Sequence, residues 1–454
     1  IILIINHYMN KFALFLLLTC VGIQAQETSK KSYSFSLQQA IEHAIENNYQ
    51  SINSGRDIES AQQKRKEATA LGLPQVNATV DFQNNFVIQK SVVPAEFFGG
   101  NPGEFVEVAF GTKQNMNARA SLNQLIFDGS YIVALQASKT YLDFYEKSKA
   151  KTDLEIKEMI INSYGNVLLS NESIAILKSN IASVEKTLFE TEQTFKNGLT
   201  EEENVEQLNI RLTTLKSSLN YSVRLKDIAL NMLKINLGIE LEDELALTDD
   251  LKSLTALNLD LALTNPEFNV EQNIDYTLMT NFVDQRNLEL KLEKSKYLPS
   301  LGASLNYGYN AFGEDFSTFT DADNWLDYSN LGLNLNIPIF SGFGRNARTQ
   351  QAKIALEQAK TELTETEQRL KLEYLTAKSK FDFDVEQYFS SKQNLTLAER
   401  IEKKQNIKFT EGLSSSFEFT EAQRQLYTAQ QDYLQAMVNV INSRAALEKI
   451  TTKN

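Results

Sequence analysis

The chain has 454 residues, of which 42% are hydrophobic, yet it contains only 18 Gly and 6 Pro. A chain of this length would ordinarily divide into about three globular domains, but so few turn residues favour a small number of long elements. The 45 basic and 58 acidic residues give a net charge of −13. This balance argues against a nucleic-acid partner, because binding to phosphates needs clustered Lys and Arg.

The first 25 residues have the features of an export signal. A basic start at Met9 to Lys11 is followed by an apolar run, residues 12–18, and Ala25 closes a cleavage site. Residues 1–8 precede this Met and are interpreted as upstream translated sequence. Cleavage after Ala25 is favoured, and lipidation at Cys20 is the alternative.

Cleavage after Ala25 would leave a mature chain without Cys and with a single His, His43. Disulfides, thiolate chemistry and Cys/His metal sites are then excluded. No catalytic residues, cofactor or metal are expected, because one His supports no catalytic set. No other apolar run reaches the ~18 residues of a transmembrane helix, so any membrane span is expected to consist of strands.

Residues 26–238 form the first of two predicted repeats. Ser36 and Gln39 make a capping box that opens a helix running towards Ala70. Alternating polar and apolar residues then predict a strand, a loop and a second strand at 75–128. A long helical hairpin follows, with its tip at 197–200. Residues 239–268 are interpreted as a mixed, acidic connector.

Residues 269–454 repeat this order. A helix precedes a strand, loop and strand at 299–341, and a second long hairpin has its tip at 411–414. Both hairpins carry apolar residues at the 3-4 spacing of coiled coils. Residues in this pattern are Leu177, Ile181, Val184, Leu188, Phe195, Val205, Leu208, Leu212, Leu215, Leu219 and Val223 in the first repeat, and Leu370, Tyr374, Ala377, Phe381, Tyr388, Leu395, Phe419, Ala422, Leu426, Ala429, Tyr433 and Met437 in the second.

The stretch Asn330–Arg348 joins the last predicted strand to the second hairpin. Apolar Leu and Ile residues occupy every second position up to Ile339, mostly alternating with Asn or Gly. A helical pattern begins after Gly344. The Gly342–Ala347 segment reads G-x-G-x-x-A, but a dinucleotide site is rejected because the preceding strand is polar on one face. The glycines are expected to turn the chain from strand into helix.

This duplicated order resembles the TolC family of outer-membrane efflux proteins. The resemblance rests on the signal peptide, on the strand ends Ile126–Gly129 (IFDG) and Pro338–Gly342 (PIFSG), and on the paired tips NGLT and EGLS. It covers essentially all of the mature chain. The motifs are individually short, and their duplicated order makes the resemblance specific.

The resemblance implies a mainly α fold with a small β part. Three chains would share a twelve-stranded β-barrel in the outer membrane, four strands from each, and their helices would continue it as a periplasmic α-barrel. The implied function is an exit duct for efflux of small molecules or secretion of proteins, not catalysis. A homotrimer, outer-membrane lipid, a periplasmic adaptor and an inner-membrane pump are the implied partners.

The resemblance also implies roles for individual residues. The tips Gly198, Leu199, Thr200, Gly412, Leu413 and Ser414 match the adaptor-docking tips of the family, whereas the simpler interpretation is that Gly ends a helix and Leu caps the coiled coil. Asn204, Glu418 and Glu421 match the periplasmic constriction, with dipole-favoured acids at a helix start as the alternative. Phe127, Gly129, Pro338, Phe340 and Gly342 mark the strand-to-helix junctions. The apolar face of the Asn330 strand should meet lipid and its Asn face the pore.

Two other classes of function remain as alternatives. A periplasmic or surface coiled-coil scaffold without a pore would not need lipid-facing strands. An exported enzyme would need catalytic residues and more loop. The sequence leaves open the transported substrate, the identity of adaptor and pump, and how the tips would gate.

Overall fold

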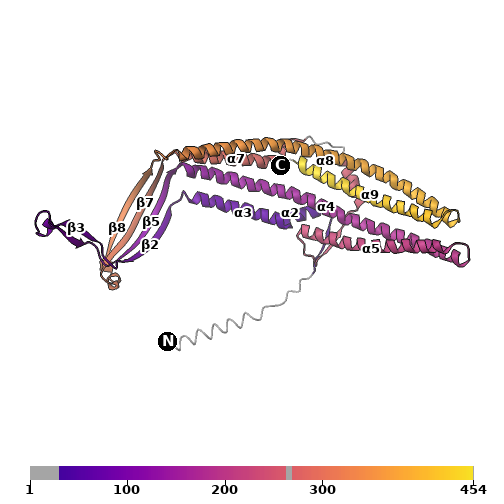
Figure 1. The fold of residues 1–454 in the computed structure, drawn as a ribbon, viewed down its shortest axis with the longest axis horizontal. Coiled ribbons are helices and arrows are strands. Elements are labelled where there is room, and N and C mark those ends of the chain that lie inside the picture. Colours follow the sequence, from indigo (N-terminus) through magenta and orange to yellow (C-terminus); the bar gives the residue numbers. More distant parts are fainter. Residues whose placement is uncertain (1–29, 262–267, 453–454) are drawn as a thin grey trace, which may run out of the picture. The chain divides into compact units, whose positions relative to one another are not determined.

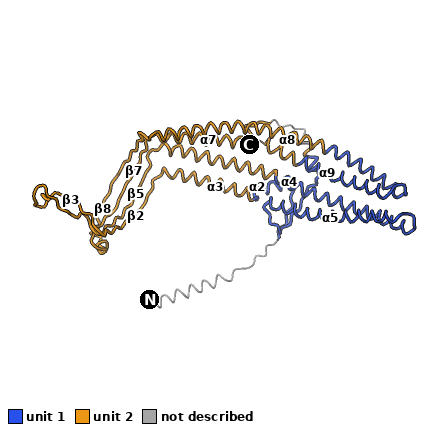
Figure 2. The backbone as a smooth tube through the Cα atoms, viewed as in Figure 1, with its two compact units in different colours: residues 1–48, 159–257, 388–441 blue, residues 49–158, 258–387, 442–454 orange. Residues whose placement is uncertain are grey.

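The computed structural model describes residues 30–261 and 268–452, which fall into two compact units (Figure 2). Unit 1 consists of residues 1–48, 159–257 and 388–441, and unit 2 of residues 49–158, 258–387 and 442–454. The predicted signal peptide and its cleavage site lie outside the described residues, as does part of the predicted connector.

Helices dominate the described part of the chain (Figure 1). In chain order they are α2 Leu37–Asn47, α3 Tyr49–Ala70, α4 Gly129–Lys196, α5 Glu202–Leu237, α6 Leu251–Leu261, α7 Ile274–Ser295, α8 Gly344–Thr410 and α9 Ser416–Thr451. Short 3-10 helices are η2 Ala95–Phe98, η3 Val270–Gln272, η4 Phe316–Thr320 and η5 Ala322–Asn324. Among the described residues, no helix carries a stretch that is both long and apolar enough to cross a membrane.

Unit 2 is built on a four-stranded antiparallel sheet with the order β2-β5-β7-β8. Its strands are β2 Gln75–Asn84, β5 Gln114–Asp128, β7 Ser300–Gly313 and β8 Trp325–Asn336. A β-bulge interrupts β5 between Leu125 and Phe127. The outer strands β2 and β8 each pair on one side only, so the sheet has two open edges.

The sheet has one apolar and one polar face, because alternate residues of each strand point to opposite sides. The registers place Val76, Ala78, Val80, Ala118, Ala120, Leu122, Leu301, Ala303, Leu305, Leu331, Leu333 and Leu335 on one face. On the other face Asn and Ser side chains bond across strands: Asn117 with Asn310, Ser121 with Asn306, and Asn306 with Asn330.

In unit 1 the hairpin formed by α4 and α5 packs on a shared apolar core. Leu177, Ile181, Val184, Leu188, Leu208, Leu215 and Phe419 are buried together. The ring of Phe419 stacks on Phe409 at 5.2 Å, which ties α9 to α8. The 3-4 spacing thus correctly predicted most of this buried seam, although Phe195 and Val223 at its ends are exposed.

A small parallel pair of strands in unit 1 was not predicted. β1 Ser32–Phe35 lies beside β6 Glu244–Leu247, inside the segment interpreted as a connector. The predicted capping box of Ser36 and Gln39 is confirmed at the start of α2. Asp249 accepts bonds from the Leu37 amide at 2.6 Å and from the Tyr164 hydroxyl at 3.0 Å, and so fastens this start to α4.

Two expected boundaries were wrong, and one predicted loop contains an additional hairpin. The first helix is broken at Asn48, whose backbone is extended and whose side chain instead donates to the Asn236 carbonyl at 2.7 Å. The loop between β2 and β5 contains a hairpin, β3 Lys90–Pro94 and β4 Phe105–Ala109. The last strand runs over Trp325–Asn336 and stops before Pro338, which has no N–H for the ladder.

Candidate functional site: helix tips, junctions and grooves

The two helical hairpins end in closely similar tips. Gly198 and Gly412 both have positive φ, 71° and 73°, which only glycine adopts without strain. The following amides of Leu199 and Leu413 each donate to the carbonyl five residues earlier, as in a Schellman motif. With their helix ends closed this way, Leu199 and Leu413 are left 77% and 78% exposed.

A polar cleft of about 420 Å³ lies between the tips within unit 1. It is lined by Thr187, Glu190, Thr191, Thr194, Leu199, Thr200, Asn204, Phe409, Thr410, Gly412 and Ser414. The cleft therefore brings together five of the predicted tip and constriction residues. Glu418 and Glu421 do not line it.

Asn204 connects the first hairpin to the start of α9. Its side-chain oxygen accepts a bond from the Ser416 amide at 3.3 Å, and its amide donates to Thr200 at 2.9 Å. Ser416 in turn donates its hydroxyl to Gln207 at 2.8 Å. An acid at position 204 would place a full negative charge in this set of hydrogen bonds. Asn204 instead joins the two tips through uncharged hydrogen bonds.

Glu418 forms a reciprocal capping box with Ser415 at the start of α9. The Ser415 amide donates to its carboxylate at 3.1 Å, and the Glu418 amide donates to the Ser415 hydroxyl at 3.2 Å. The Ser414 hydroxyl adds a bond of 2.7 Å. These bonds lower the pKa of Glu418, and the bond from Ser414 has the largest effect. The carboxylate is therefore both a helix cap and a persistent negative charge. The spacing Ser415-x-x-Glu418 could have revealed this cap.

Glu421 lies instead in a groove between α5 and α9. Arg424 binds both of its carboxylate oxygens, at 2.6 and 2.8 Å, and this pairing lowers the pKa of Glu421. Arg211 lines the same groove, and its Nε is buried without a hydrogen-bond partner among the described residues. Burial lowers the pKa of Arg211, and the nearby Arg424 adds to the effect. Neither arginine was predicted from the sequence, and Arg424 offsets the acidic character predicted at position 421.

The first strand-to-helix junction depends on close packing at Gly129. A Cβ there would lie 2.8 Å from the Leu298 side chain and 3.3 Å from Ser295. Asp128 caps α4 by accepting bonds from the amides of Ser130 and Tyr131. Phe127, past the bulge, faces Leu301 on the apolar side of the sheet.

The second junction is a tight turn. Gly342 and Phe343 have φ of 56° and 63°, and the Gly344 amide donates to the Ser341 carbonyl at 3.0 Å, which is the pattern of a type I′ turn. Left-handed backbone costs a residue other than glycine about 1–2 kcal/mol. Pro338, Phe340 and Gly342 were predicted as junction residues from the sequence, whereas Phe343 was not.

The buried side chain of Arg345, which was not predicted from the sequence, stabilises this turn. Its side chain is 7% exposed and donates to the carbonyls of Pro338 at 3.1 Å and Lys296 at 3.3 Å. It also bonds the Ser341 hydroxyl and lies over the Tyr297 ring. One guanidinium thus joins the end of α7, the turn and the start of α8.

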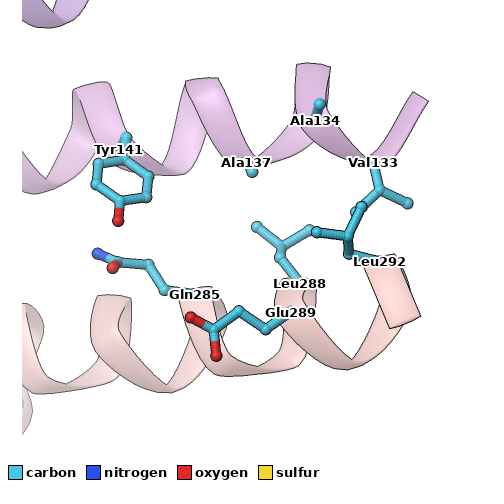
Figure 3. A pocket seen from close by; sticks show the side chains of 8 residues that line it. All are labelled: Val133, Ala134, Ala137, Tyr141, Gln285, Leu288, Glu289 and Leu292. Atoms are coloured by element: carbon cyan, nitrogen blue, oxygen red, sulfur yellow. The ribbon is translucent and has the colours of Figure 1, made fainter. Parts of the chain in front are cut away.

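A further groove in unit 2 separates α4 from α7 (Figure 3). Val133, Ala134, Ala137 and Tyr141 line it from α4, and Gln285, Leu288, Glu289 and Leu292 from α7. Its volume of about 190 Å³ is below the roughly 300 Å³ of small ligand sites. Glu289 is already paired with Arg286. We therefore assign no ligand to this groove.

Comparisons with known proteins agree with this architecture. A family model described as outer membrane efflux protein matches residues 282–452. The outer membrane protein TolC of Vibrio cholerae serotype O1 is 21% identical over 335 residues, which cover 74% of this chain and 72% of that protein.

Several solved structures share the fold over nearly the whole chain. CusC superposes with a TM-score of 0.73 at 15% identity and covers 95% of this chain and 96% of its own. The CmeC outer membrane channel of Campylobacter jejuni superposes with a TM-score of 0.69 at 18% identity and covers 94% of this chain and 90% of its own. VceC of Vibrio cholerae superposes with a TM-score of 0.69 at 16% identity and covers 92% of this chain and 96% of its own.

These matches are to a family of efflux channels and not to a family of enzymes. Residues 282–452 thus match the outer membrane efflux protein family, and the chain has the fold of solved outer-membrane proteins such as VceC and CmeC.

Proposed function

We propose that three copies of this chain form a single exit duct. The four strands β2, β5, β7 and β8 of each copy would close a twelve-stranded barrel in the outer membrane, and the helices would continue the duct through the periplasm. The duct would serve efflux of small molecules or secretion of proteins. A periplasmic adaptor and an inner-membrane pump would complete the pathway at the helix tips.

The observation that carries the proposal is the combination of two open edges with two unlike faces in the sheet. In lipid, unpaired backbone groups at an edge cost several kcal/mol each, so β2 and β8 need partners. Among the described residues each is paired on one side only. Pairing β2 of one copy with β8 of the next satisfies both edges with identical contacts.

The faces of the sheet suit this arrangement. The apolar face is exposed along β8 at Leu331, Leu333 and Leu335, as expected for side chains that meet lipid. The opposite face presents the cross-strand Asn and Ser side chains, which suit a water-filled lumen. A coiled-coil scaffold without a pore would have no use for a whole exposed apolar face.

The tips support the proposed contact with an adaptor. Leu199 and Leu413 are exposed apolar side chains on rigidly closed helix ends, and they flank a polar cleft. Such an apolar anchor beside polar groups is typical of protein docking surfaces.

Disulfide trapping between the edge strands tests the proposed assembly. The only Cys, Cys20, lies in the predicted signal peptide. Once this peptide is cleaved, disulfides can form only between introduced cysteines. We expect Thr79→Cys in β2, combined in turn with Asn330→Cys, Gly332→Cys or Asn334→Cys in β8, to give reducible trimers in at least one combination. The single variant Thr79→Cys is the control and should give no trimer. Monomers in every combination would contradict the proposal.

A further inference from the structure

The turn after β8 exposes an aromatic pair on a strained backbone. The side chains of Phe340 and Phe343 are each 74% exposed and contact one another edge to face, with ring centroids 5.6 Å apart. Phe343 is the only residue other than glycine with positive φ in the described ranges 30–261 and 268–452. Glycine, which flanks it on both sides, would adopt this backbone without strain.

Burial of the side chain does not offset the strain at Phe343, although hydrogen bonds hold the backbone of the turn. A bulky residue held in the left-handed region normally gains something from its side chain, such as burial in a core. Here the ring meets Phe340 and is otherwise open. Most of the Phe343 ring is therefore available for a contact outside this chain.

The neighbouring residues show what kind of contact this is. Ile337 and Ile339 continue the alternation of Leu331, Leu333 and Leu335 beyond the end of β8, and Ile339 is 91% exposed. Exposed apolar side chains therefore continue from β8 through Ile337 and Ile339 to the aromatic pair. Next to the turn, Lys296 and Arg348 both pair with Glu293, at 2.6 and 3.6 Å, so this group carries one net positive charge, which suits a lipid phosphate.

The two ends of the apolar face also differ in their aromatic residues. At the end where β8 begins, Phe82, Phe316, Phe319 and Trp325 form a cluster, with ring centroids 5.7 to 6.4 Å apart. At the other end Val76, Leu122 and Leu335 are aliphatic. Membrane-embedded sheets carry aromatic girdles at both interfaces. The aromatic side chains at this end are Phe127, Tyr297, which is 45% exposed, and the pair in the turn.

We propose that Phe340 and Phe343 insert into the periplasmic leaflet of the outer membrane at the level of the lipid glycerol groups and fix the depth of the sheet. The inference rests on the proposed function, because it requires the apolar face to meet lipid. Arg345 would act as a positioning residue: its bonds to Pro338 and Lys296 hold the turn against the end of α7. The strained backbone directs the Phe343 ring outward.

Fluorescence quenching by brominated lipid tests this insertion. Trp325 is the only Trp in the chain, so the Trp325→Phe variant has no tryptophan fluorescence of its own. Into it we place Phe343→Trp, Leu333→Trp on the apolar face, or Leu413→Trp at a helix tip with similar exposure. Each full-length protein is reconstituted into phosphatidylcholine vesicles brominated either near the glycerol or near the chain methyl end.

We expect Phe343→Trp to lose more fluorescence to bromine near the glycerol, Leu333→Trp to lose more to bromine near the methyl end, and Leu413→Trp to lose none. Quenching of Leu333→Trp without quenching of Phe343→Trp would overturn the inference and leave the proposed function standing. Absence of quenching at both positions would overturn the proposed function as well. A ring covered by a neighbouring copy or by an adaptor would give the first of these results.

Two further variants guard against effects on folding and test the role of the turn. Phe340→Trp carries no backbone strain and should report the same depth as Phe343→Trp. In the Leu333→Trp reporter, adding Phe340→Ser and Phe343→Gly should reduce the difference between the two brominated lipids, whereas adding Phe343→Tyr should preserve it. An unchanged difference after removal of both rings would show that they do not set the depth.

Discussion

At the scale of single residues, the two predicted constriction acids are not equivalent. Glu418 is bonded by neutral groups of its capping box, with Lys408 as a weaker charged neighbour, whereas the charge of Glu421 is offset by two bonds from Arg424. Rings of carboxylates in a pore favour cations. If three copies line a constriction, Glu418 should therefore contribute more to cation preference than Glu421.

Single-channel recordings in planar bilayers check this ranking. We expect Glu418→Gln to lower the cation preference more than Glu421→Gln, Arg424→Gln to raise it, and Glu418→Lys with Glu421→Lys to reverse it. Because hydrogen bonds lower the pKa of both carboxyls, the preference should persist to more acidic pH than for an ordinary glutamate. A preference unaltered by the double reversal would remove both residues from the selectivity site.

Sequence spacing predicted which residues of this region lie near the tips but not their partners. Gly198 and Gly412 could be placed because a helix end needs a residue with positive φ. The bonds from Ser416 to Asn204 and Gln207 join residues more than two hundred positions apart. Such contacts depend on how two hairpins pack, and no local pattern encodes that.

At the scale of elements, the two hairpins present equivalent apolar tips. The helices α5 and α9 both have 36 residues, and each is preceded by a glycine-closed end with an exposed leucine. Charged groups at both leucines should prevent an apolar contact with an adaptor, because burying an unpaired carboxylate is unfavourable. The helices themselves should tolerate the change, since these side chains pack against little.

We expect Leu199→Asp with Leu413→Asp to abolish crosslinking to the adaptor while trimers persist on native gels. Ile228→Asp is the matched control, because Ile228 is an exposed apolar residue of α5 away from the tip and should leave crosslinking intact. Adaptor crosslinking that survives the double change would refute the docking role of the tips.

Long elements were predicted best because their patterns repeat many times. The 67 residues of α8 begin at Gly344, as expected from the change of period there. The four-residue strands β1 and β6 were missed, because each is too short to show a period and their partners lie far apart in sequence. The end of β8 was misplaced because its alternation continues past Asn336 to Ile339, where Pro338 stops the ladder but not the apolar face.

At the scale of the whole molecule, a duct and a scaffold differ in what their loss does to the cell. A duct provides the exit step for compounds that a pump captures, so its removal should stop export without changing entry. A scaffold in the envelope would instead alter permeability in general. Measurement of dye efflux from preloaded cells separates these effects, because entry has already taken place.

We expect deletion of this chain, together with any paralogues, to sensitise cells to exported toxic compounds and to slow dye efflux. Wild-type protein should restore both, whereas the variant with Leu199→Asp and Leu413→Asp should restore neither, because an undocked duct receives no substrate. Ile228→Asp should behave as wild type. Unchanged sensitivity in the deletion strain would count against the duct, and full rescue by the tip variant would show that export does not require docking at the leucines.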